Sequence, residues 1–222
     1  MSGIVMVVVL GIIAVSIAAI HIYGCRSSDA RYRTYTKPFL VPSMTALAVA
    51  VIKMQGNHLQ ILVPFLVAMA FYTAGDILLM LEGKEKLFLL GMVSFAVGHV
   101  IVAVSFLSTG TRLLYLIVSA LIWFSILVFL FFPRLDPKNR MTPYLKAYGT
   151  MVALYGIMVT ASTFNGNLPS HVLAVLGVAM FGISDSMIAF RVTDGRDRST
   201  RVMATYIMAV AFLLSSAVLL AS

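Results

Sequence analysis

Charged residues and cysteine are scarce in this sequence. Only 11% of its 222 residues are charged, and Cys25 is the single cysteine, which excludes a disulfide bond within the chain. His and Cys residues form no cluster, and the hydrophobic runs contain only two carboxylates, so we expect no metal and no other cofactor. So low a charge content, together with 61% hydrophobic residues, excludes a soluble domain of this size.

Long hydrophobic runs take up most of the chain instead. Eight of them are apolar and long enough to be read as crossings of ~30 Å of hydrocarbon. They fall at about residues 3–23, 38–53, 60–81, 87–107, 113–132, 143–162, 170–190 and 202–220. The segments between them are short and rich in Gly, Pro, Asn, Asp or charge. We therefore predict an all-α, polytopic membrane protein with eight transmembrane helices in a single domain, residues 1–222.

Lys and Arg residues fall almost entirely on one side of this predicted topology. The even-numbered loops contain only Lys53 and Arg112, whereas the odd-numbered loops contain Arg26, Arg31, Arg33, Lys37, Lys84, Lys86, Arg134, Lys138, Arg140, Arg191, Arg196, Arg198 and Arg201. Because cytoplasmic loops carry an excess of Lys and Arg, we predict that the odd-numbered loops are cytoplasmic and both termini lie outside. Topology and attraction to the anionic headgroups of the lipid bilayer explain the net charge of +8, so we expect no nucleic-acid partner.

Two aspartates interrupt otherwise uncharged runs. Asp76 lies in "FYTAGDILLML" and Asp185 in "FGISDSMIAF". Each precedes a charged residue, Glu82 or Arg191, by six positions, so both are predicted ~9 Å below the cytoplasmic ends of two parallel helices. An intramembrane carboxylate is costly and usually functional. Two at matched depth favour one shared site, although hydrogen bonding between helices is a simpler alternative for each.

A second spacing indicates internal symmetry. Pro38 opens the second run in "TKPFL" and Pro143 opens the sixth in "MTPYL", 105 residues apart, while the two aspartates are 109 apart. Proline is tolerated at a helix start, where its missing N–H has no partner to lose. We interpret the pair of spacings as a four-plus-four parallel repeat, which makes the aspartate-bearing helices pseudo-symmetric mates around one cavity.

Three further polar residues lie within the predicted helices. Tyr206 and Lys146 are five and six residues from the cytoplasmic ends of theirs, level with the aspartates, where they could orient or ionise a carboxylate. Lys146 could equally extend to the interface, and Tyr206 could be an interfacial aromatic. His99 is predicted ~20 Å down the fourth helix, not level with the aspartates, where a packing role is the simpler interpretation.

Several short motifs together resemble a known family. The segments "TKPFLVP", "GDILLML", "LGMVSFAVGH", "FGISDSMIAF" and "ATYIMA" occur in this order between about residues 36 and 210. This ordered set resembles the YhhN family of eight-helix membrane proteins, whose characterised members are lysoplasmalogenases. The resemblance implies that Asp76 and Asp185 are catalytic. It also places Lys37, His99 and Tyr206 at motif positions.

The chemistry of that activity suits two carboxyl groups. Hydrolysis of a vinyl ether requires a proton on the alkenyl carbon, and water then captures the resulting oxocarbenium ion. One carboxyl group can donate the proton while the other stabilises the cation and positions water. A site ~9 Å below the surface matches the first bonds of a lipid chain. The lysophospholipid phosphate would meet the basic rim, with Lys37 and Arg191 as binding candidates, although both can equally be charges that set the topology.

Two other functions fit the same residues. A proton-coupled carrier for a small solute could use intramembrane aspartates within paired helical repeats, although no Gly- or Pro-broken helix pair is found near the midplane. A structural or lipid-sensing protein would use the aspartates only to hold helices together. Amide substitutions separate these cases, because a structural role predicts lost stability and not a lost reaction. The substrate headgroup and the oligomeric state are not indicated by the sequence.

Overall fold

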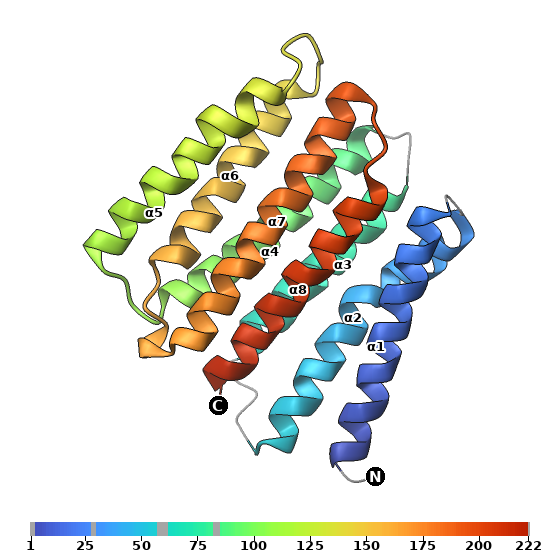
Figure 1. Cartoon of the computed structure of the whole chain (residues 1–222), viewed down its shortest axis with the longest axis vertical. Helices are drawn as coiled ribbons and strands as arrows, with labels where there is room; N and C mark the ends of the chain where they lie inside the picture. Colours follow the sequence, from blue (N-terminus) through green and yellow to red (C-terminus); the bar gives the residue numbers. More distant parts are fainter. Residues whose placement is uncertain (1–2, 28–29, 57–61, 82–84, 222) are drawn as a thin grey trace.

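The computed structural model describes residues 3–27, 30–56, 62–81 and 85–221, and within these ranges the chain is helical with no strand. Its α-helices are α1 (Gly3–Arg26), α2 (Ala30–Met54), α3 (Val63–Met80), α4 (Glu85–Leu107), α5 (Leu113–Ser125), α6 (Thr142–Ala161), α7 (Leu168–Asp194) and α8 (Ser199–Ala221). Successive helices run in opposite directions, so the odd-numbered connections gather at one end of the bundle and the two termini lie at the other (Figure 1). The all-α prediction is confirmed.

Seven of the described helices are long and apolar enough to cross a membrane. The helix outside this set is α6, where Lys146 and several Tyr and Thr residues lower the hydropathy. It packs between α5 and α7 and against α4, as part of the same bundle. The chain is therefore a multi-pass membrane protein, while the count of eight spans and the outside location of the termini stay predictions.

The prediction for the start of the second helix is wrong. α2 begins at Ala30, so Pro38 and Pro42 lie inside the helix and not at its first turn. Proline inside a membrane helix is tolerated because neighbouring helices and hydroxyl side chains re-satisfy the freed backbone groups. Pro143, in contrast, does lie in the first turn of α6. The predicted equivalence of the two prolines therefore fails at the level of local structure.

The helix contacts follow a pattern with a period of four helices. α1 packs on α2, α3 on α4, α5 on α6 and α7 on α8. Between these pairs, α2 contacts α3 and α8, and α6 correspondingly contacts α7 and α4, whereas the contact of α1 with α8 has no comparable counterpart between α5 and α4 among the described residues. A four-plus-four repeat requires such equivalent contacts. The internal symmetry itself stays a prediction.

Small residues bring α3 and α4 close together beside Asp76. A Cβ atom added at Gly75 would lie 2.6 Å from the ring of Phe95, and one added at Gly91 would lie 2.9 Å from Leu79. Close approach through small residues is how membrane helices gain packing contacts where no water drives them together. This contact fixes α3 against α4 at the residue next to Asp76.

The fifth membrane segment changes its winding near one end. After α5, residues Ile126–Phe131 form a π-helical turn, and Phe132–Arg134 form a 3-10 turn that contains Pro133. A π-helical turn is rare and often lies at a functional site. The side chains of this turn form part of a cavity wall described below.

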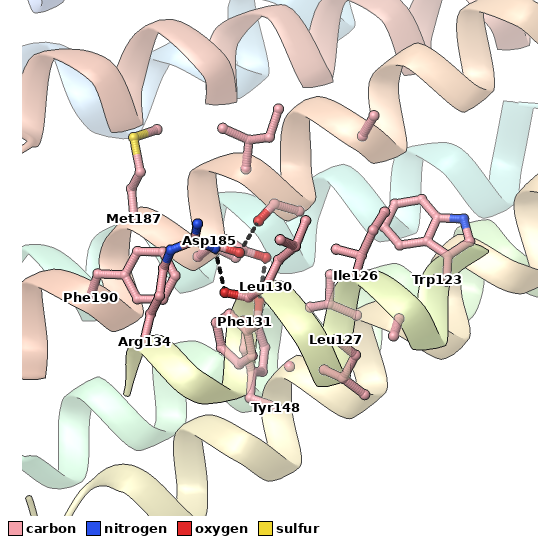
Figure 2. A pocket seen from close by; sticks show the side chains of 17 residues that line it. Trp123, Ile126, Leu127, Leu130, Phe131, Arg134, Tyr148, Asp185, Met187 and Phe190 are labelled. Atoms are coloured by element: carbon pink, nitrogen blue, oxygen red, sulfur yellow. Dashed lines mark hydrogen bonds between the residues drawn. The ribbon is translucent and has the colours of Figure 1, made fainter. Parts of the chain in front are cut away.

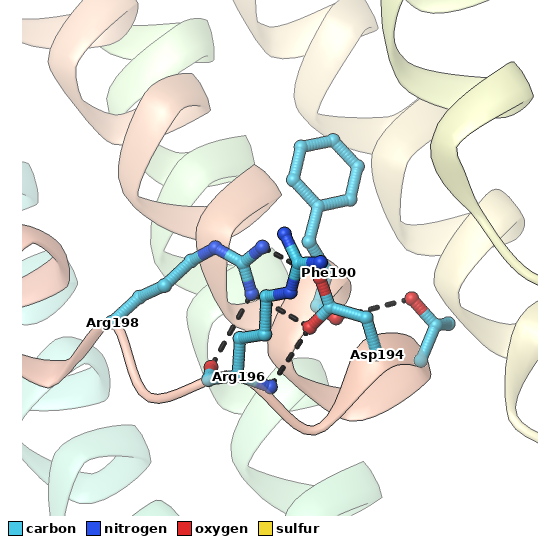
Figure 3. A network of polar contacts seen from close by, with 5 residues as sticks. Phe190, Asp194, Arg196 and Arg198 are labelled. Carbon is cyan, nitrogen blue, oxygen red and sulfur yellow. Dashed lines mark hydrogen bonds and ion pairs between the residues drawn. The ribbon is translucent and has the colours of Figure 1, made fainter.

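The α7–α8 connection is held by a local polar network (Figure 3). Gly195 ends α7 in the left-handed conformation with φ 72°, which glycine adopts at no steric cost. The guanidinium of Arg198 then donates to both carboxylate oxygens of Asp194, at 2.7 and 2.6 Å, and the Arg196 N–H donates to the same carboxylate. The network fixes where α8 begins relative to α7.

Candidate active site

Asp76 is buried where α2, α3 and α8 meet. It is 3% exposed. The Tyr206 hydroxyl, from α8, donates a hydrogen bond of 2.7 Å to its Oδ2, and the Lys37 ammonium, from α2, lies 3.5 Å from its Oδ1. A carboxylate in hydrocarbon needs such partners because water is not there to solvate it. Both oxygens of Asp76 therefore have a polar partner from another helix.

Asp185 has an equivalent environment where α4, α6 and α7 meet. The Tyr148 hydroxyl, from α6, donates a hydrogen bond of 3.0 Å to its Oδ2. His99 Nε2, from α4, lies 3.5 Å from the same oxygen, beyond good hydrogen-bond geometry, and is buried without another hydrogen-bond partner. The Asp185 side chain is 11% exposed, so this carboxylate is more accessible than Asp76.

A cluster of aromatic side chains connects the two aspartates. The Tyr72 hydroxyl, from α3, forms a 2.8 Å hydrogen bond with His99 Nδ1, which leaves Nε2 directed at Asp185. The Phe181 ring lies within 5.4 Å of the rings of Tyr72, His99 and Tyr206. Tyr155 stacks on His99, with ring centres 4.5 Å apart. The cluster fixes the His99 ring and joins both carboxylate environments into one buried unit.

An apolar cavity of about 360 Å³ opens beside Asp185 (Figure 2). Its wall is formed by the π-helical turn and by facing positions of α5, α6 and α7. Asp185 and Tyr148 lie part-way along it, with Phe190 and Arg134 toward one end and Trp123 toward the other. The cavity therefore brings a carboxyl group to the side of a slot that can take a hydrocarbon chain.

The YhhN family model matches residues 32–217 of this chain, well over half of it. The chain belongs to the YhhN family. Comparison with curated proteins and with solved structures gave no match. The family assignment confirms the resemblance drawn from the five motifs, and both aspartates fall within the matched range.

In this YhhN family protein the structure brings most of the predicted site residues together. Lys37 and Tyr206 contact Asp76, and Tyr206, at 4% exposure, is a buried residue and not an interfacial aromatic. Arg191 borders a separate polar cavity that Lys37 also lines. Lys146 lies apart: it is exposed, and its ammonium is 5.6 Å from the centre of the Phe132 ring. Among the described contacts none joins Lys146 to a carboxylate.

The expectation that His99 is not level with the aspartates is wrong, because its ring reaches Asp185. α7 continues past Phe190 to Asp194, so Asp185 lies nine residues, or about 13 Å, from the end of its helix. The sequence-based estimate ended that helix near residue 190 and placed Asp185 too close to the surface. The greater depth of Asp185 and the length of the two side chains together account for the difference in depth that was predicted between His99 and Asp185.

Tyr72 and Tyr148 are site residues that the sequence reasoning missed. Tyr72 precedes Asp76 by four residues and so shares its helix face, a spacing that could have identified it. Tyr148 lies two residues after Lys146, at nearly the same depth but on a different face of α6. The depth estimate therefore identified the correct depth on α6 but selected Lys146, whereas Tyr148 is the side chain that contacts Asp185.

Proposed function

We propose that this protein is a lysoplasmalogenase, which hydrolyses the vinyl ether bond of an alkenyl lysophospholipid to a fatty aldehyde and a glycerophospho product. The observation that carries the proposal is the position of Asp185, a carboxyl group at the wall of an apolar cavity inside a membrane helix bundle. A lipid chain in this cavity presents its first bonds to that carboxyl group.

The proposed reaction begins with proton transfer from the Asp185 carboxyl group to the alkenyl carbon that is not bonded to oxygen. The other alkenyl carbon and the ether oxygen then share the positive charge of an oxocarbenium ion. Water adds to this carbon and loses a proton to the Asp185 carboxylate. The resulting hemiacetal separates into the aldehyde and the glycerol hydroxyl, so one water is consumed and Asp185 is protonated again. General acid catalysis of this kind contributes about 10²–10⁴-fold in rate.

The partners of Asp185 are suited to hold its carboxyl group in a fixed orientation. Tyr148 holds one carboxylate oxygen by its hydroxyl group. His99 Nε2 lies 3.5 Å from the same oxygen and has no other hydrogen-bond partner. Tyr72 fixes the His99 ring through the opposite nitrogen. We assign Tyr148 and His99 as positioning residues of the proton donor.

Asp76 is proposed as the second carboxylate, which stabilises the cation. It has a formal positive charge beside it, Lys37, whereas Asp185 has hydroxyl and imidazole partners. Two carboxyl groups in different environments divide the roles of proton donor and charge stabiliser, as in glycosidases. The aromatic cluster between the two aspartates keeps water out of this region. The lower dielectric constant strengthens the electrostatic attraction between the Asp76 carboxylate and the cation.

The test is release of long-chain aldehyde from an alkenyl lysophospholipid by the purified protein in detergent. Turnover is expected in the parent, with losses of about 10²-fold or more in Asp185→Asn and Asp76→Asn. Asp136→Asn is the matched control, because this loop residue is exposed and Asn keeps the oxygen that accepts the 2.9 Å hydrogen bond from Lys138 N–H. Folded parent protein that releases no aldehyde would reject the proposal and favour the carrier, which proton flux in proteoliposomes would then test.

A further inference from the structure

A second cavity, of about 250 Å³, lies at the end of the bundle where the odd-numbered connections gather. Unlike the cavity beside Asp185, its wall includes several basic and other polar side chains among the apolar ones. Three cations line it, Arg33 and Lys37 from α2 and Arg191 from α7. The remaining wall consists of His21, Cys25, Thr34, Leu79, Met80, Phe88, Ile188, Ser199, Val202 and Met203.

Arg33 is the residue of this cavity that most clearly lacks an acceptor. Its Nε is buried and has no hydrogen-bond partner, although the guanidinium group is always charged. A buried donor without an acceptor is unfavourable, and more so on a charged group. A ligand with several acceptor oxygens would remove that cost. The planar guanidinium group is suited to bind a phosphate through two parallel hydrogen bonds.

The acidic groups near the cavity do not cancel its positive charge. Asp76 lies against Lys37, and Asp197 lies in the α7–α8 connection. Hydrogen bonds from Ser199 lower the pKa of Asp197, and the charges of Arg191 and Arg33 lower it further. Among the described residues, two carboxylates therefore lie near three basic side chains, which leaves an excess of positive charge at the cavity. His21 also lines the cavity, and its Nδ1 forms a 2.7 Å hydrogen bond with the Thr36 hydroxyl group.

Lys37 and Arg191 connect this cavity to the catalytic groups. The Lys37 ammonium, on a side chain only 17% exposed, lines the cavity and also lies 3.5 Å from Asp76. Arg191 follows Asp185 on α7 by six residues, or about 9 Å along the helix axis. The glycerol unit of a lysolipid, together with the length of the Arg191 side chain, can span this distance between the vinyl ether at Asp185 and the phosphate at Arg191. The cavity is thus placed where the headgroup end of a bound lysolipid would lie.

We propose that Arg33, Lys37 and Arg191 form a binding site for a phosphate group, namely the headgroup phosphodiester of the lysolipid. This assignment deepens the proposed function and rests on it for the identity of the lipid. The phosphate fixes the depth of the substrate, so that its vinyl ether stops beside the carboxyl groups while its chain extends along the apolar cavity. Arg33 is the new member of the set, since sequence reasoning singled out only Lys37 and Arg191.

The first experiment measures binding and not turnover. Arg33→Gln and Arg191→Gln are compared with the parent for binding of 1-alkyl lysophosphatidylethanolamine, whose saturated ether the proposed reaction does not cleave. Both variants should bind it about 10- to 100-fold more weakly, as expected for lost hydrogen bonds to a charged group. Both should bind 1-alkylglycerol, which has no phosphate, as the parent does. Arg201→Gln is the matched control, because Arg201 is exposed at the same end of the bundle and does not line the cavity.

Inorganic phosphate distinguishes a headgroup site from a site for the free ion. Phosphate that competes with the alkyl lysolipid in the parent, and no longer does so in Arg33→Gln, supports the headgroup assignment. Phosphate that binds without displacing the lipid would overturn it. Arg191→Lys, which keeps the charge, should recover part of the affinity, and thermal unfolding should show that each variant is folded. Equal lipid affinity in the parent and both Gln variants would also reject the site, even if aldehyde release has been demonstrated.

Kinetics give an independent readout if the parent releases aldehyde. Loss of a phosphate contact remote from the reacting bond should raise KM by about 10- to 100-fold with little change in kcat, if the contact is equally strong in the ground and transition states. A merely structural defect would lower kcat through the fraction of active enzyme and leave KM unchanged. Because the binding experiment needs no turnover, failure of the proposed function and failure of this site remain distinguishable.

Discussion

Tyr206 donates a 2.7 Å hydrogen bond to Asp76, a residue 130 positions earlier in the chain. The contact joins α8 to α3, and the ring of Tyr206 also packs on Phe181, with centres 5.4 Å apart. One side chain therefore both satisfies a buried carboxylate and forms part of the aromatic cluster that leads to Asp185. Substitutions that separate these two roles give the sharpest tests of the site.

Tyr206→Phe keeps the ring and removes the hydroxyl group. We expect aldehyde release to fall by about 10- to 100-fold, because a hydrogen bond to a charged group is lost beside the proposed cation-stabilising carboxylate. The measurement is kcat alongside the thermal unfolding midpoint. Full activity in the folded variant would show that the Tyr206 hydroxyl is not needed for the reaction.

Tyr148→Phe tests the corresponding contact at Asp185. Loss of its 3.0 Å hydrogen bond frees the carboxyl group to rotate, so we expect kcat to fall by about 10-fold or more. Tyr144→Phe on the same helix is the control, since Tyr144 is 52% exposed and should tolerate the change. If the two substitutions have equal effects, Tyr148 does not position the proton donor.

Lys37→Met leaves Asp76 buried with only one polar partner. Removing one member of a buried ion pair costs about 3–5 kcal/mol, and the lower end applies here because Lys37 keeps some exposure. Addition of Asp76→Asn should recover part of this free energy of unfolding, because no uncompensated charge remains. Unfolding titrations in mixed micelles measure both. Strictly additive effects would mean that the two residues are not energetically coupled.

Ala179→Leu tests whether the apolar cavity accepts the lipid chain. Ala179 lines the cavity six residues before Asp185, about 9 Å along α7, so a larger side chain there should shorten the space available. We expect kcat/KM to fall for long alkenyl chains and to change little for short ones. Val172→Leu, at a position 49% exposed on the same helix, should leave the chain-length profile unchanged. An unchanged profile in Ala179→Leu would place the chain elsewhere.

Gly75→Ala tests the close approach of α3 and α4. The added methyl group would meet the Phe95 ring at 2.6 Å, and overpacking of this kind typically costs about 1–3 kcal/mol. We expect a lower thermal unfolding midpoint and lower activity, since Asp76 is the next residue. Gly11→Ala is the control, because its methyl group would lie 4.0 Å from Leu47, an ordinary contact. Equal stability of the two variants would contradict the packing argument.

The aspartates, the family and the succession of helices could be predicted because they depend on local properties of the chain. A run of apolar residues reports its own length, and Asp76 and Asp185 are conspicuous in such runs whatever they contact. Helix ends were less predictable. Pro38 was expected to start a helix, and lies inside one because the surrounding membrane bundle tolerates it.

The partners of the aspartates were decided by the tertiary structure. In lipid the outward and inward faces of a helix are both apolar, so hydrophobic periodicity gives little information on which face points inward. The sequence therefore identified Lys146 at a suitable depth but could not show that Tyr148, on another face, would contact Asp185. It determined that this chain is a helical membrane protein with two intramembrane carboxyl groups. Only packing of α3, α4, α6, α7 and α8 around one aromatic cluster, with rotations fixed by close helix contacts, turned those groups into a candidate active site.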